Sequence, residues 1–94
     1  MELGKVVGQV VSTVRDPGLP NLTLLLVDIV DAAGKVVLGS QVAADSIGAG
    51  EGELVLLVRG SSARMIMEAK TPLDLSIVGI VDQVTARKKT LYTK

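Results

Sequence analysis

The side chains that most often carry out chemistry are missing from this sequence or occur outside any catalytic motif. The 94 residues contain no histidine and no cysteine. This excludes the usual zinc sites, Ser-His-Asp and Cys-His nucleophilic centres, and acid–base catalysis by histidine. Ten carboxylates remain, and folding could bring two of them together, but no spacing in the sequence indicates such a pair. The sequence therefore predicts no catalytic residue, no metal site and no bound cofactor.

Two glycine-containing segments have parts of nucleotide-binding motifs. Residues 48–53, Gly-Ala-Gly-Glu-Gly-Glu, match the first half of a dinucleotide fingerprint, but Glu53 stands where the third glycine belongs. Glu51 and Glu53 would also repel a pyrophosphate. Gly4-Lys5 lacks both the preceding glycine and the following Ser or Thr of a P-loop. Neither segment therefore predicts nucleotide binding.

The charges are balanced overall but unevenly distributed. Ten acids oppose ten bases, so attraction of the whole molecule to nucleic acid or to an anionic membrane is weak. Residues 1–82 carry ten acids and six bases, a net charge of −4, whereas residues 83–94 carry four bases and no acid, a net charge of +4. This basic end could dock on a neighbouring copy or on acidic cargo, or it could simply aid solubility.

Cysteine content and hydropathy predict where the protein is located. A chain without cysteine suits a reducing cytosol. The first residues lack the apolar run of a signal peptide, and no apolar stretch approaches the roughly 18 residues needed to span a bilayer. We therefore expect a cytoplasmic protein that does not interact with membranes.

Turn-forming residues divide the chain into short apolar segments. Fifteen valines and a single aromatic residue, Tyr92, favour strands built from branched aliphatic side chains. A brief helix is predicted over residues 61–69, with Ser61 or Ser62 as its N-cap. The expected strands are Leu3–Val14, Leu22–Val30, Lys35–Ala44, Leu54–Val58 and Leu73–Val84. This order predicts an all-β domain over residues 1–85, a small five-stranded OB-like barrel with one short helix, followed by a basic tail over residues 86–94.

Several of these strands are apolar at every position. Leu24–Val27, Leu54–Val58 and Ile77–Val81 do not alternate between apolar and polar residues. Because successive side chains of a strand point to opposite faces, both faces need cover, and the chain has room for barely one helix. We interpret this pattern as surface for identical subunits, with Leu25, Val55 and Leu57 at the contact. The alternative is an ordinary core with a few exposed leucines.

Five motifs occur together and in order along the chain. They are Leu3–Gly8, Leu24–Val27, Asp45–Glu53, Gly60–Arg64 and Asp74–Asp82. In this combination the sequence strongly resembles the EutN/CcmL family of bacterial microcompartment vertex proteins. The resemblance implies a barrel assembled as a cyclic homopentamer, which caps the vertices of a shell tiled mainly by hexameric shell proteins. It also implies that the protein is structural and does not catalyse a reaction.

The resemblance assigns roles to two segments. It implies that the loop Ser46, Ile47, Gly48, Ala49 and Gly50 from each copy lies near the fivefold axis and lines a small opening. The alternative is a plain connection between strands, distant from the axis. It also implies that Arg64, with Ser61 and Ser62, lies at a subunit boundary, whereas an ordinary solvated arginine is the alternative.

Two other classes of function remain open at this point. An OB-like barrel could be a binding module for single-stranded nucleic acid or a small ligand. Such sites need stacking aromatic side chains beside a basic groove, and Tyr92 alone is a weak substitute. An enzyme using carboxylates is the third class. The mass of the protein in solution separates an assembly from a monomeric binding module.

Overall fold

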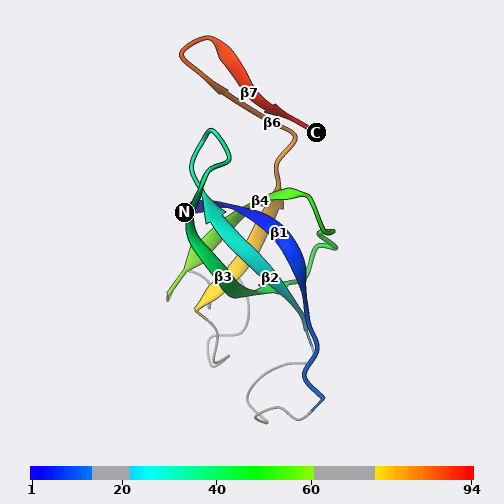
Figure 1. The fold of residues 1–94 in the computed structure, drawn as a ribbon. Helices are drawn as coiled ribbons and strands as arrows, with labels where there is room; N and C mark the ends of the chain where they lie inside the picture. The colour runs from blue at the N-terminus through cyan, green and yellow to red at the C-terminus, as the bar shows by residue number, and fades with distance from the viewer. Residues whose placement is uncertain (14–21, 61–73) are drawn as a thin grey trace.

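The valine-rich segments form strands that close into a barrel. The computed structural model describes residues 1–13, 22–60 and 74–94. The barrel strands are β1 (Glu2–Val10), β2 (Thr23–Val30), β3 (Val36–Asp45), β4 (Leu54–Arg59) and β5 (Leu75–Ile80) (Figure 1). They pair in the order β1-β2-β3-β5-β4, and β4 pairs back to β1. All these pairs are antiparallel except β3–β5. The prediction of a small all-β barrel is confirmed, while the predicted helix over 61–69 lies outside the described residues.

The interior of the barrel is filled by one face of each strand. The buried cluster consists of Val6, Leu25, Val27, Ile29, Ala43, Val55, Leu57, Leu75 and Ile77. Leu25 is 6% exposed, and Val55 and Leu57 are 0% exposed. Because a closed barrel points these side chains inward, their own chain already covers them. The expectation that Leu25, Val55 and Leu57 contact a neighbouring subunit is therefore corrected: their side chains belong to the core of one chain.

Gly4 allows β1 to close the barrel. This residue pairs with Ile29 of β2 and with Val55 of β4, so β1 bridges the two strands at this point. A Cβ atom at Gly4 would lie 2.5 Å from Cδ1 of Leu57 and 3.3 Å from the backbone oxygen of Asp28. The space beside Gly4 is thus occupied by a core leucine, and a larger residue would displace it.

Exposed aliphatic side chains gather on β3. Val36, Val37, Leu38 and Val42 are 51%, 68%, 49% and 47% exposed. One edge of β3 pairs with β2 along most of its length. Among the described residues, the other edge pairs with β5 at Ala44 and Asp45. The apolar surface expected from the sequence therefore exists, but it is carried by β3 rather than by the inward residues.

The C-terminal residues form a hairpin that projects from the barrel. Strands β6 (Gln83–Ala86) and β7 (Lys89–Thr93) pair with each other (Figure 1). The predicted fifth strand thus ends at Ile80 rather than at Val84, and the predicted tail supplies the turn and the second strand of the hairpin. Together the barrel and the hairpin give the molecule dimensions of 47 × 23 × 21 Å. In the part of the chain described, no helix has the length and apolar character needed to cross a membrane.

Candidate functional site

The loop between β3 and β4 is the segment for which the sequence predicted a functional role. Ser46, Ile47 and Gly48 are exposed, whereas Ala49 and Gly50 are half-buried against the barrel. Gly48 has a φ angle of +84°, a conformation that side-chain-bearing residues rarely adopt. The loop therefore follows a path that depends on glycine, with its first half turned toward solvent.

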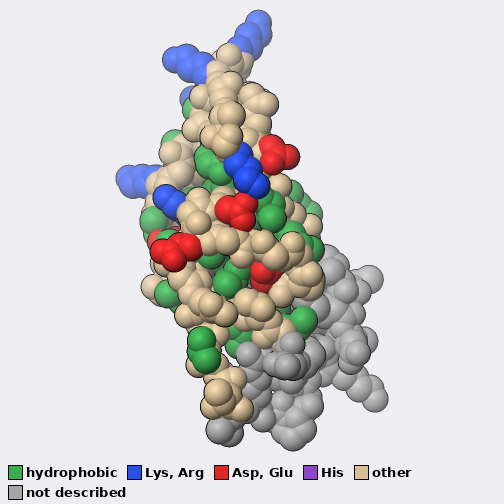
Figure 2. Space-filling model, turned by 90° about the vertical axis from the view of Figure 1, so that its right-hand side faces the viewer, with side chains coloured by type: hydrophobic (Ala, Val, Ile, Leu, Met, Phe, Trp, Pro, Cys, Tyr) green, Lys and Arg blue, Asp and Glu red, His purple; other side chains and the backbone are tan. Residues whose placement is uncertain are grey.

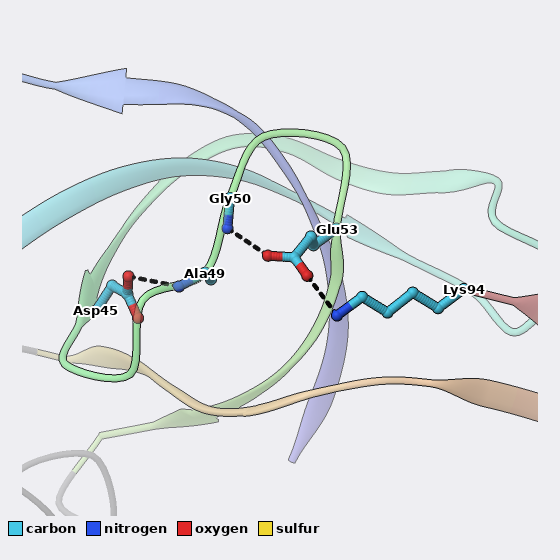
Figure 3. Close-up of polar contacts among 5 residues, drawn as sticks. All are labelled: Asp45, Ala49, Gly50, Glu53 and Lys94. Atoms are coloured by element: carbon cyan, nitrogen blue, oxygen red, sulfur yellow. Dashed lines mark hydrogen bonds and ion pairs between the residues drawn. The ribbon is translucent and has the colours of Figure 1, made fainter.

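A buried carboxylate holds the first half of this loop. Asp45, the last residue of β3, is only 6% exposed. Its Oδ1 atom accepts a hydrogen bond from the backbone N–H of Ile47 at 3.1 Å. Its Oδ2 atom accepts one from the backbone N–H of Ala49 at 2.9 Å (Figure 3). Hydrogen bonds to an ionised acceptor are stronger than those between neutral groups. Asp45 therefore fixes the backbone of the loop at two points.

A second carboxylate holds the other half of the loop. Oε1 of Glu53 accepts a hydrogen bond from the N–H of Gly50 at 2.6 Å, and Oε2 lies 2.8 Å from Nζ of Lys94 (Figure 3). Lys94 is held in turn, because its backbone N–H donates to the carbonyl of Asp82 at 2.8 Å. We call the contact between Glu53 and Lys94 the C-terminal latch, since it joins the loop to the last residue of the chain.

The latch shifts the ionisation of both partners in the direction expected of an ion pair. The hydrogen bond from Lys94, and then the one from Gly50, lowers the pKa of the Glu53 carboxyl below its ordinary value of 4.5. The hydrogen bond to Glu53 raises the pKa of Lys94 above its ordinary value of 10.5. Both groups are therefore charged near neutral pH, and the latch is intact there.

The base of the loop is also tied to β1. The N–H of Val6 donates to the carbonyl of Glu53 at 3.0 Å, and the N–H of Gly52 donates to the carbonyl of Val6 at 2.8 Å. These bonds, with those of the two carboxylates, leave the loop few alternative conformations. A backbone held in this way suits close packing against another rigid surface.

The acidic side chains of Asp45 and Glu53 interact with the loop's own backbone and with Lys94. Within residues 1–13, 22–60 and 74–94, no group of three acidic side chains is placed to hold a metal ion. The loop instead presents backbone and small side chains beside an exposed isoleucine, Ile47, which is 46% exposed.

Sequence reasoning found this loop but not the side chains that shape it. Asp45 could have been recognised, because an aspartate commonly accepts a hydrogen bond from the N–H two residues later. The contact between Glu53 and Lys94 gave no such signal, since 41 positions separate the two residues. Of the other predicted site residues, Arg64, Ser61 and Ser62 lie outside the described residues.

A closed barrel, a rigid external loop, a projecting hairpin and exposed aliphatic side chains define a subunit suited to assembly with other protein surfaces. Comparison with known proteins identifies the family. A family model described as ethanolamine utilisation protein EutN/carboxysome matches residues 1–82. The chain belongs to the EutN/CcmL family.

Individual relatives match the chain over nearly all or all of its length. The bacterial microcompartment shell vertex protein EutN of Salmonella typhimurium is 50% identical, and the alignment covers 100% of this chain and 96% of that protein. The carboxysome shell vertex protein CcmL of Gloeobacter violaceus is 40% identical, with coverage of 100% and 95%. The solved structure of GrpN, a pentameric microcompartment shell protein from Rhodospirillum rubrum, is 41% identical with a TM-score of 0.82, covering 92% of this chain and 99% of that one.

Proposed function

We propose that this protein forms a cyclic pentamer that caps the vertices of a bacterial microcompartment shell. The observation that carries the proposal is the match, over the full chain, to shell vertex proteins of two kinds of microcompartment. Five copies of 9.8 kDa give a ring of 49 kDa. Each subunit of such a ring uses one surface toward the preceding copy and a different surface toward the next, and the rotation of a fifth of a turn closes the ring.

The vertex role follows from symmetry. A flat layer of hexamers has no curvature, so a closed shell needs sites of fivefold symmetry at its corners. We propose that the pentamer occupies these corners and contacts hexameric shell proteins along its rim. The exposed aliphatic side chains of β3, Val36, Val37, Leu38 and Val42, support extensive contacts of this molecule with other protein surfaces.

In this proposal the loop Ser46–Gly50 of each copy lies near the fivefold axis. Its rigidity supports the placement, because five copies can approach an axis closely only if none of them moves into the others. Replacing Gly50 by valine is an ambiguous test, since a Cβ atom there lies 3.3 Å from Oε1 of Glu53 and disturbs the loop itself. Replacing the exposed Ile47 by lysine is sharper, because it adds a charge without a contact in the core.

Five lysines at position 47 repel one another if the loop surrounds the axis. We expect the concentration for half-dissociation of the ring to rise at least tenfold in low salt and to recover in high salt, where exposed charges are screened. Gln9→Lys, on an exposed position of β1 outside the hairpin, is the matched control. Equal stability of the Ile47→Lys and Gln9→Lys rings at low salt would place the loop away from the axis.

The proposal includes the absence of catalysis. It is supported by the lack of histidine and cysteine and by the engagement of Asp45 and Glu53 in hydrogen bonds within the loop. A structural role makes no use of a general base or a nucleophile. A shell protein acts through the shape and the stability of the surface it forms.

Co-expression with hexameric shell proteins tests the function. With the wild-type chain we expect closed particles, and without it we expect open-ended or incomplete particles, scored by electron microscopy. Light scattering of the purified chain should give 49 kDa. A chain that stays at 9.8 kDa at high micromolar concentration, or particles that close equally well without it, would refute the vertex role.

A further inference from the structure

A hollow of about 520 Å³ lies between the turn that joins β2 to β3 and the β6–β7 hairpin. We call it the hairpin groove. Its lining is mostly apolar, with two bases and one acid: Ala32, Ala33, Ala86, Leu91, Arg87, Lys89 and Asp31. The turn that forms one wall is well defined, because Oδ1 of Asp31 accepts hydrogen bonds from the N–H groups of Ala33 and Lys35 at 3.0 and 2.9 Å.

The hairpin that forms the other wall receives little support from its own barrel. In the described part of the chain, β6 and β7 form a separate two-stranded sheet that pairs with no barrel strand. Its C-terminal end is held by Lys94, through Asp82 and the latch with Glu53. A two-stranded hairpin by itself is at best marginally stable in water. The hairpin therefore gains stability from any surface that covers its apolar side.

The turn of this hairpin uses residues that do not favour its conformation. Arg87 and Lys88 have φ angles of +52° and +63°, which is the pattern of a two-residue type I′ turn. Asn-Gly or Asp-Gly would adopt it with less strain. The two bases are nevertheless at the tip, and Figure 2 shows Lys and Arg side chains at the projecting end of the molecule. Arg87, the first of these two turn residues, also lines the hairpin groove.

The net charge of the hairpin segment is opposite in sign to that of the rest of the chain. Residues 83–94 carry a net charge of +4 and residues 1–82 carry −4. Among the described residues, the ion pairs formed are Arg59–Glu2 and Lys94–Glu53. Arg87 and Lys89 therefore form no ion pair within that part of the chain, although Asp31 lines the same groove. A second copy presents the acidic body that this rim attracts.

We propose that the hairpin groove receives the acidic body of the neighbouring copy and is one half of the subunit contact that closes the ring. This inference rests on the pentamer of the proposed function and names the surface that joins its subunits. An aliphatic side chain of the neighbour enters the groove against Leu91 and Ala33, while Arg87 and Lys89 face acidic side chains at its rim. The contact joins two different surfaces, as a head-to-tail ring requires.

Two matched pairs of variants test this contact. Leu91→Asp puts a charge into the groove, whereas Thr90→Asp puts the same charge on the opposite face of β7. Lys89→Glu reverses a charge of the rim, whereas Lys88→Glu reverses the adjacent charge, which does not line the groove. We expect the concentration for half-dissociation, measured by light scattering, to rise at least tenfold for Leu91→Asp and Lys89→Glu and less than threefold for their controls.

A labelling experiment with the folded, assembled protein gives a second measurement. The chain has no cysteine, so Ala33→Cys introduces a single thiol in the groove. We expect a maleimide to label it at least tenfold more slowly at concentrations where the ring is assembled than at concentrations where it dissociates. Circular dichroism of every variant shows whether the barrel remains folded.

The outcomes separate this inference from the proposed function. A wild-type chain that never assembles refutes both. A wild-type pentamer whose Leu91→Asp and Lys89→Glu variants assemble like their controls refutes the groove contact and leaves the vertex role standing. Binding of a different shell protein in the groove, with the ring unaffected by Leu91→Asp, also overturns the proposal.

Discussion

Replacing Asp45 by asparagine should loosen the β3–β4 loop without unfolding the barrel. The carboxylate uses one oxygen for Ile47 and the other for Ala49. Asparagine keeps one oxygen and replaces the other with an amide NH₂ group that cannot accept a hydrogen bond. One of the two bonds is therefore lost. A hydrogen bond to a charged group contributes about 1.5–3 kcal/mol, which corresponds to a roughly 10- to 150-fold change in local opening at about 1.4 kcal/mol per factor of ten.

Amide hydrogen exchange measures this change directly. We expect the amide of Ile47 or Ala49 to exchange roughly 10- to 150-fold faster in Asp45→Asn, while amides of the barrel core such as Val55 keep their protection. Glu51→Gln is the matched control, because Glu51 is an exposed carboxylate of the same loop. All proteins are compared at one concentration, since assembly contributes to their apparent stability.

One result would refute this reasoning. If the Ile47 and Ala49 amides exchange equally fast in Asp45→Asn and in Glu51→Gln, the bonds to Asp45 do not hold the loop. Faster exchange spread over the whole barrel would show instead that Asp45 supports the fold rather than the loop.

Two further predictions concern the barrel and the latch. Gly4→Ala should lower the free energy of unfolding by about 1–2 kcal/mol, because the cost of displacing Leu57 exceeds the gain from the lower entropy of the unfolded chain. Urea unfolding measures this change. Gly8→Ala should show no loss of stability, because a Cβ atom at that position meets ordinary contacts at 3.8 Å. The latch should stabilise the folded loop fully between about pH 4.5 and 10.5, which are the ordinary pKa values of its two partners. This contribution should be lost as the pH falls through the lowered pKa of Glu53, and also as the pH rises through the raised pKa of Lys94. The chemical shift of the Gly50 amide, which donates to Glu53, should titrate in acid with a midpoint below pH 4.5. A midpoint at or above pH 4.5 contradicts the latch.

The barrel strands could be predicted because their signals are local. Runs of valine and leucine between proline, glycine and aspartate turns indicated five strands, and the expected limits of β2 and β4 differ from the observed ones by a single residue. The end of the last barrel strand was harder to place. Val81 and Val84 continue the apolar pattern, yet β5 ends at Ile80. The N–H of Val81 still donates to the carbonyl of Leu54 at 2.8 Å. Since Leu54 is the first residue of β4, pairing with that strand cannot continue further.

A short strand near Leu91 and Tyr92 was an open interpretation of the sequence, but its pairing with residues 83–86 in a hairpin was not predicted, because the turn lacks the usual signal. A two-residue turn is recognised from Asn-Gly or Asp-Gly, and here Arg87-Lys88 occupies it. Local sequence signals also do not predict which residues hold the β3–β4 loop in place. A glycine-rich segment predicts a loop, but the partners of Glu53 depend on where residue 94 returns in space.

By itself, the sequence determined the class of the protein. Its strand pattern and its ordered set of motifs indicated a small β-barrel of the EutN/CcmL family. Only the tertiary structure decided which aliphatic side chains are available for assembly. The residue pattern of a strand shows that its two faces differ, but closure of the barrel determines which face points inward. The side chain of Leu57 therefore lies in the core, whereas that of Leu38 lies at the surface.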